Sequence, residues 1–246
     1  ITINDIVAAN TDVGEIKNVE EFIAAYEGEI NQLDYEFKQF FQTLENSGRL
    51  DDTIIVFTAD HGEEFDEHDT TAMHLSLYNE VTNVPLVFFI PGIEPVIKKD
   101  VVEIRSIPST ILDLATPLKE KLFTAPSLTQ IINGTGRNDG YAIMVSAIQK
   151  DSTINSIEKV YENIESLDKI FSVGIRNEDY VYPLYSSVRT ADWRLLQNPD
   201  GSLELYDQHQ DPEEQSPVDI SKGNNSEISK ITESLLELIE RNINNK

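Results

Sequence analysis

A run of β-forming, apolar residues ends almost directly at a carboxylate and an imidazole. Residues 53–58 read Thr-Ile-Ile-Val-Phe-Thr, and Asp60-His61-Gly62 follows after one alanine. Such a run is apolar on both faces, as expected of a strand buried in a parallel sheet. Ligand sites of open α/β sheets lie at the carboxyl ends of strands. The pattern therefore predicts that Asp60 and His61 stand at a functional edge of a sheet.

The chemistry of this pair favours a divalent cation. A carboxylate is a hard oxygen ligand and an imidazole is a borderline nitrogen ligand, while Gly62 lets the chain turn sharply beside them. Spacing alone leaves a second explanation open. An Asp-His pair at the end of a strand can also be an ordinary turn whose side chains bond to nearby backbone.

The elements on either side of this strand predict an α/β fold. Apolar residues recur at steps of three and four over residues 19–47, which is typical of an amphipathic helix with one face packed on a sheet. Gly48 is expected to end this helix in a left-handed cap, and Gly28 within it suggests a close backbone approach. Residues 84–90 predict a second buried strand, and residues 107–114 a helix with Pro108 in its first turn.

The C-terminal part has a different pattern. Asn198-Pro199-Asp200-Gly201 predicts a hairpin loop. Residues 228–243 predict an amphipathic helix. Short strands are predicted at residues 141–148, 182–188, 193–197 and 203–206. We therefore expect an α/β domain over residues 1–150, and a small subdomain of antiparallel strands and a terminal helix over residues 151–246.

The charge of the chain limits its partners. The 246 residues include 44 acidic and 19 basic ones, for a formal net charge of -25. This charge disfavours nucleic acid and anionic membranes, and no apolar run reaches the roughly 18–20 residues of a membrane span. The acidity has two explanations: a solvated surface that aids solubility, or adaptation to high salt, as in a halophile. A gain in unfolding free energy with added salt is expected only under the second.

Cysteine is absent, so disulfides and thiolate metal sites are excluded. The chain begins at Ile1 and shows no signal peptide. We expect it to be part of a longer gene product. Its location stays open, with a soluble, cytoplasmic protein slightly favoured, and its oligomeric state is not indicated.

Other polar residues near the strand are ambiguous by themselves. A single histidine such as His74 is more often structural than functional. His68 lies in an acidic loop and is interpreted as solvated, and His209 as peripheral. The acidic run Glu63, Glu64, Asp66 and Glu67 could attract a cation, but in an acidic protein it is more simply a surface.

Several segments in the same order strongly resemble the sulfatase family of the alkaline-phosphatase-like superfamily. In that family a Y-x-G-E-I-x-x-L-D helix precedes a D-T-x-x-x-x-x-S/T-D-H/N-G strand, and similar sequences occur here at residues 26–34 and 52–63. Further resemblances extend to residue 214. They are an L-Y-E-E…R-V-P-L segment at residues 77–86, a D-I-x-P-T-L-L-D-L-A helix at 107–115, and C-terminal motifs at 187–194 and 204–214.

The resemblance implies roles for three residues. Asp60 and His61 would be ligands of the catalytic metal, and His74 would be a catalytic and substrate-binding residue that contacts sulfate or phosphate oxygens. The fold would be an alkaline-phosphatase-like mixed or parallel sheet flanked by helices, with residues 1–150 forming the C-terminal part of the catalytic domain. The metal would be a divalent cation, with Ca²⁺ favoured, or Mn²⁺ or Zn²⁺ if the protein is phosphatase-like.

The nucleophile of the family has no counterpart in this chain. It is a formylglycine made from Cys or Ser, or a Ser or Thr in phosphate-transferring relatives, and it lies upstream of the helix at 19–47. The leading expectation is a sulfuric ester hydrolase that acts on a small-molecule or glycan sulfate. The alternatives are a phosphodiester or phosphonate hydrolase, a phosphoglycerol transferase, or a non-catalytic truncated fragment.

Overall fold

The computed structural model groups the chain into two compact units. The first comprises Ile1–His74 and Asn83–Val96, and the second comprises Leu75–Thr82 and Ile97–Lys246. Each is described by itself below. The structure describes residues 18–68, 76–116, 122–136, 140–149, 175–177, 180–198, 200–220 and 226–244.

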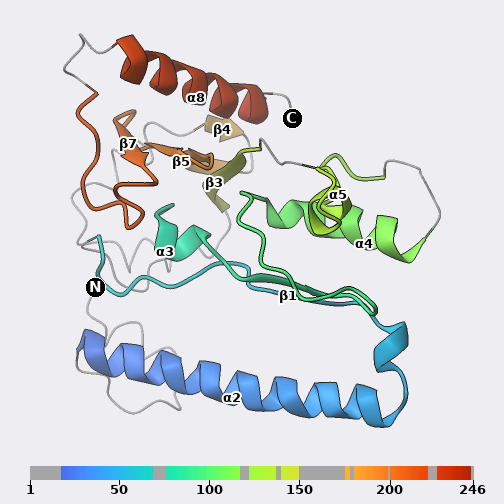
Figure 1. Cartoon of the computed structure of the whole chain (residues 1–246). Coiled ribbons are helices and arrows are strands. Elements are labelled where there is room, and N and C mark those ends of the chain that lie inside the picture. Colours follow the sequence, from blue (N-terminus) through green and yellow to red (C-terminus); the bar gives the residue numbers. More distant parts are fainter. Residues whose placement is uncertain are drawn as a thin grey trace. The chain divides into compact units, whose positions relative to one another are not determined.

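The long helix of the first unit matches its prediction. Helix α2 spans Val19–Asn46 (Figure 1), and the Asn18 side chain caps it by accepting a 2.8 Å hydrogen bond from the Glu21 backbone N–H. Gly48 follows with a φ of 66°, the left-handed conformation expected at the helix end. The expected close approach at Gly28 is not found among the described residues, since none of their heavy atoms outside the helix's own backbone lies within 4 Å of the position of a Cβ there.

Two short strands accompany this helix. After a 3-10 turn at Leu50–Asp52, strand β1 spans Ile55–Thr58 and strand β2 spans Leu86–Phe89. They pair antiparallel, with Ile55 opposite Phe89, so the prediction of a parallel strand is wrong for this pair. Helix α2 packs on them through aromatic rings. The ring centroids of Phe37 and Phe57 are 5.3 Å apart, and those of Phe41 and Phe89 are 5.4 Å apart.

The second unit is built on an antiparallel sheet. Its strand order is β3-β5-β6-β7, and β4 pairs with β5. The predicted hairpin loop joins β6 and β7: the Asn198 N–H donates to the Ser202 carbonyl at 2.9 Å, and Gly201 has a φ of 83°. The strands span Ala142–Gln149 (β3), Ile175–Asn177 (β4), Tyr180–Arg189 (β5), Trp193–Gln197 (β6) and Leu203–Asp207 (β7).

Short helices precede this sheet in the sequence. A 3-10 turn at Ile104–Ser106 leads into helix α4 at Ile107–Ala115, with proline in the first turn as predicted, and helix α5 spans Thr129–Ile132. Thr110 connects α4 to the loop before α5. Its buried hydroxyl accepts a 2.9 Å hydrogen bond from the Leu128 N–H.

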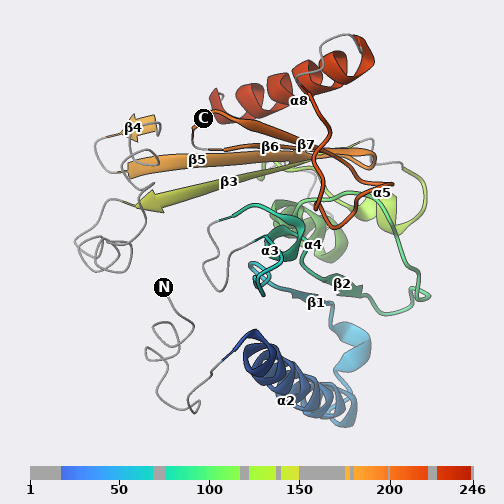
Figure 2. The same cartoon turned by 90° about the vertical axis from the view of Figure 1, so that its left-hand side faces the viewer.

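Alternating residues of the sheet pack into two different layers, and Figure 2 shows α8 lying over one of the two faces. Helix α8, at Ser226–Asn244, covers one face and packs Leu235 and Ile239 against Val188, Leu195 and Leu205. The other face carries Leu196 and Tyr206, which pack against Leu77 just before helix α3, at Asn79–Thr82. The period of two along β6 therefore places Leu195 and Leu196 in separate cores.

The predicted fold class is confirmed: the structure is mixed α/β, with a small antiparallel sheet and a C-terminal helix. The division of the sequence near residue 150 stays a prediction. Across the described ranges, every helix is too short or too polar to cross a membrane.

The core under α8 predicts a clear difference in stability between two substitutions. Leu195 is fully buried, so Leu195→Ala should lower the free energy of unfolding by about 2–5 kcal/mol. Ile97 is 90% exposed, so Ile97→Ala should change it by less than about 0.5 kcal/mol. Chemical denaturation of both variants tests this, and equal effects would contradict the assigned core.

Candidate metal site

The end of β1 presents the two residues that the sequence predicted as metal ligands. Ala59 follows the strand, and Asp60 and His61 come next, with side chains that are 89% and 46% exposed. The Asp60 Oδ1 atom accepts a 3.0 Å hydrogen bond from the backbone N–H of His61. This bond fixes the carboxylate beside the imidazole.

The orientation of the His61 ring suits a ligand role. Its Nδ1 atom lies 2.8 Å from the Gly62 carbonyl oxygen. A neutral imidazole with its proton on Nδ1 donates to that carbonyl and presents the Nε2 lone pair. Histidines that bind metals usually donate their other N–H to a carbonyl or carboxylate in this way.

The spacing of the two donor atoms fits one cation. Asp60 Oδ2 and His61 Nε2 are 3.8 Å apart. Two ligand atoms that lie about 2.4 Å from one Ca²⁺, at an angle of about 90–105°, are about 3.4–3.8 Å apart. The pair therefore fits as two ligands of a divalent ion. Within the described ranges, no group of three or more His, Cys, Asp or Glu side chains gathers to complete such a site.

The acidic loop that follows was predicted to be exposed on the surface, but one of its glutamates is buried. Glu64 is fully buried, whereas Asp66 and Glu67 are exposed. Asp66 adopts a φ of 79°, a left-handed conformation that Asp tolerates better than most residues. The Glu67 carboxylate turns back to accept a 2.5 Å hydrogen bond from the Phe65 N–H. Sequence reasoning missed the burial of Glu64 because it lies in a run with Glu63, Asp66 and Glu67.

The other histidines divide into three cases. His74, the predicted substrate contact, lies outside the described residues. His68 is partly buried and takes part in an interaction. His209 is exposed and peripheral as expected, and its Nε2 atom lies 2.8 Å from Asp192 Oδ1.

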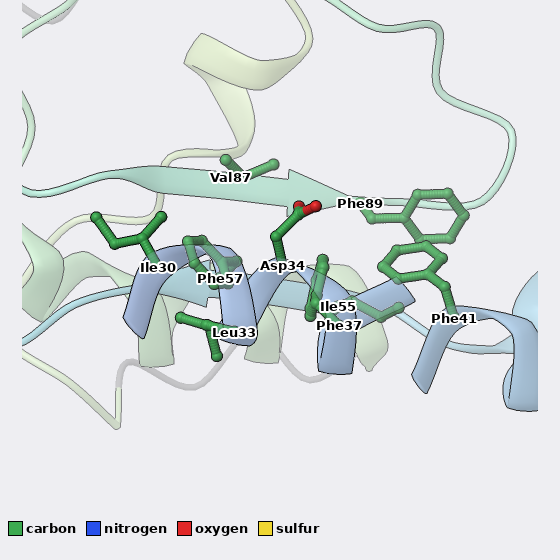
Figure 3. A pocket seen from close by; sticks show the side chains of 9 residues that line it. All are labelled: Ile30, Leu33, Asp34, Phe37, Phe41, Ile55, Phe57, Val87 and Phe89. Atoms are coloured by element: carbon green, nitrogen blue, oxygen red, sulfur yellow. The ribbon is translucent and has the colours of Figure 1, made fainter. Parts of the chain in front are cut away.

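An apolar pocket lies between α2 and the two strands of the first unit (Figure 3). It has a volume of about 280 Å³, and Asp34 is the one charged residue in its lining. The other lining residues are Ile30, Leu33, Phe37, Phe41, Ile55, Phe57, Val87 and Phe89. Such a lining offers no cation and no N–H donor side chain for a sulfate group, so this pocket is not the candidate substrate site.

Comparison with known proteins supports a specific class. A solved phosphonate monoester hydrolase from Silicibacter pomeroyi superposes with a TM-score of 0.69 at 22% identity, over 91% of this chain and 42% of that one. A protein solved in complex with its substrate, D-glucosamine-2-N,6-O-disulfate, superposes with a TM-score of 0.62 at 19% identity, over 97% and 44%. The predicted fold is therefore confirmed as the fold that these two proteins share with this chain.

In sequence, residues 4–117 match the family model named Sulfatase. A protein from Formosa agariphila named "Sulfatase" is 28% identical over 227 residues, which cover 92% of this chain and 36% of that protein. The predicted resemblance to the sulfatase family is thus confirmed, with the family model matching residues 4–117. The chain spans about a third of the length of the curated relatives that it matches, at 36% and 33% of the first two.

The His209–Asp192 pair predicts a small dependence of folding stability on pH, which is separate from the metal site. The hydrogen bond to Asp192 raises the pKa of His209. A raised pKa in the folded state means that this contribution to stability is present at low pH and is lost as pH rises through the folded pKa. Asp192→Asn should return the His209 pKa to its ordinary range in an NMR titration. An unchanged His209 titration would contradict the contact.

Proposed function

We propose that the protein containing this chain is a metal-dependent hydrolase of sulfuric esters, with Asp60 and His61 as ligands of the catalytic cation. The observation that carries the proposal is the 3.8 Å spacing of Asp60 Oδ2 and His61 Nε2, at the end of a strand within the segment that matches the sulfatase family. The orientation of His61 toward the Gly62 carbonyl supports it.

Each residue of the pair has a defined task. A divalent cation supplies neutralising charge for the anionic oxygens of the ester group. Asp60 contributes a full negative charge to the ion. His61 has to be neutral to offer Nε2, so protonation of its imidazole and metal binding compete, and cation affinity should fall as pH is lowered. Calcium is the favoured ion; manganese or zinc would suit a phosphatase-like reaction.

His74 is proposed to complete the contact with the substrate. In its protonated form it would donate a hydrogen bond to a non-bridging oxygen of the ester group, and it could assist the leaving oxygen. The alcohol part of the substrate is proposed to be a sugar. This choice is supported by the structurally similar protein that was solved with a disulfated glucosamine as its substrate.

A second candidate function is hydrolysis of a phosphonate or phosphodiester. The similarity of this chain to a phosphonate monoester hydrolase favours it. All three kinds of ester carry a single negative charge at neutral pH, and the two functions differ in the atom that is attacked, sulfur or phosphorus. Parallel assays of the complete gene product with an aryl sulfate and with a phenyl phosphonate monoester would separate them.

Loss of either proposed ligand should abolish both cation binding and catalysis. In the complete gene product, Asp60→Ala and His61→Ala should each lower kcat/KM for an aryl sulfate by about 100-fold or more, because several kcal/mol of charge stabilisation depend on the bound ion. A chelator should inactivate the wild-type protein, and added Ca²⁺ should restore it.

The control is Asp51→Ala, which removes an exposed carboxylate at the opposite end of β1. It should leave both Ca²⁺ affinity, measured by calorimetry, and kcat/KM unchanged. Retention of cation affinity and ester cleavage in both Asp60→Ala and His61→Ala would overturn the proposal.

A further inference from the structure

Arg194 lies fully buried in the sheet of the second unit, on the face opposite α8. Its Nε atom donates to Ser187 Oγ at 3.0 Å, and its Nη1 atom donates to Glu214 Oε1 at 3.3 Å. Its Nη2 atom donates to Thr82 Oγ1 at 3.0 Å and to the Leu77 carbonyl oxygen. A single guanidinium therefore joins β5, β6 and the loop after β7 to both ends of the turn between Leu77 and Thr82, here called the 77–82 turn.

Glu214 fixes the same turn from the loop after β7. Its side chain is also fully buried. Its Oε2 atom accepts a 3.0 Å hydrogen bond from the Asn79 backbone N–H, and its Oε1 atom accepts a 3.2 Å bond from Gln208 Nε2. Burial lowers the pKa of Arg194 to about 10, which leaves the guanidinium charged at neutral pH. The turn is therefore held by a buried ion pair whose hydrogen bonds have defined directions.

A methionine sulfur lies against the same guanidinium. Met144, in β3, is partly buried and packs against the cluster that contains Leu77 and Tyr206. Its Sδ atom is 3.8 Å from Arg194 Nη2. This nitrogen carries two N–H bonds and has three acceptors around it: a carbonyl oxygen, the Thr82 hydroxyl and the thioether. Because a thioether is a weak acceptor, the two oxygens hold both N–H bonds.

Oxidation of the sulfur would change this competition. When hydrogen peroxide reacts with a thioether, the O–O bond breaks and an S–O bond forms. The sulfur gives up two electrons, and the rest of the peroxide leaves as water. The sulfoxide is polar, and its oxygen is a much better acceptor than the thioether. In Met144 that oxygen would be bonded to an atom already in contact with Arg194 Nη2, so it would compete with the Thr82 hydroxyl for an N–H bond.

Methionine is the only amino acid that gives this chain an oxidisable sulfur. The sequence contains two methionines and no cysteine. Met144 is partly exposed, which gives a small oxidant access to its side chain. The second methionine, Met73, lies outside the described residues and offers a matched control.

We propose that Met144 is an oxidation site for peroxides, and that its sulfoxide draws the Arg194 guanidinium away from Thr82 and loosens the 77–82 turn. All of these residues belong to the second unit. Reductases that act on methionine sulfoxide restore the thioether, so the change is of a reversible kind. The inference does not depend on the hydrolase function proposed above, and its test does not use catalysis.

The test treats the complete gene product with hydrogen peroxide. Peptide mass spectrometry should find one oxygen atom added to Met144. Amide hydrogen exchange then reports on the 77–82 turn, where the N–H groups of Val81 and Thr82 both donate to the Tyr78 carbonyl at 3.1 Å. Exchange in this turn should become about 10-fold faster, as expected when one hydrogen bond from a charged group is lost. Exchange within α8 should stay unchanged.

Three variants sharpen the test. Met144→Leu keeps the side-chain volume and removes the sulfur, so peroxide should no longer change exchange in the turn. Met73→Leu should respond as the wild-type protein does. Met144→Gln places an amide oxygen, a strong acceptor, near the guanidinium, so it should accelerate exchange in the turn without peroxide. If this variant does not fold, the peroxide experiment on the wild-type protein and Met144→Leu decides the matter.

Several outcomes would overturn the inference. One is a Met144 side chain that stays unmodified in the folded protein at a peroxide concentration that oxidises it in the urea-unfolded protein. Another is oxidised Met144 with unchanged exchange in the 77–82 turn, or an equal response in Met144→Leu. A parallel acceleration throughout α8 would also contradict it, because general loosening does not single out the turn.

Discussion

The second unit depends on one buried ion pair, that of Arg194 and Glu214. Both side chains are fully buried, and their closest charged atoms are 3.3 Å apart. A charge removed from water has to be matched by other polar groups, since an unmatched one is strongly destabilising. Ser187, Asn79, Gln208 and Thr82 supply those groups. The 77–82 turn is thereby tied to the C-terminal sheet although more than 100 residues separate them in the sequence.

The connection from β1 to β2 has defined contacts at both of its ends. It begins with Asp60 and His61, whose donor atoms are spaced for one cation, and it ends with the turn that the Arg194–Glu214 pair holds.

Helices, helix ends and tight loops could be predicted from the sequence because each depends on residues that are close together in the chain. The apolar stripe gave α2, Gly48 marked its end, and Asn198–Gly201 gave the hairpin loop. Asp60 and His61 could be predicted as candidate ligands because they are adjacent in the chain and follow a β-forming run. The Arg194–Glu214 pair could not. An arginine between Trp193 and Leu195 suggests an outward-facing strand position, and its partners depend on tertiary contacts. Antiparallel pairing of β1 with β2 was likewise not visible, since apolar runs do not specify strand direction.

The most direct test of the account is a crystal structure of the complete protein grown with Mn²⁺ as an anomalous substitute for calcium. The account predicts an anomalous peak bonded to Asp60 Oδ2 and to His61 Nε2, with His61 Nδ1 still facing the Gly62 carbonyl. A well-occupied metal peak bound elsewhere, with neither of these two atoms as a ligand, would contradict it.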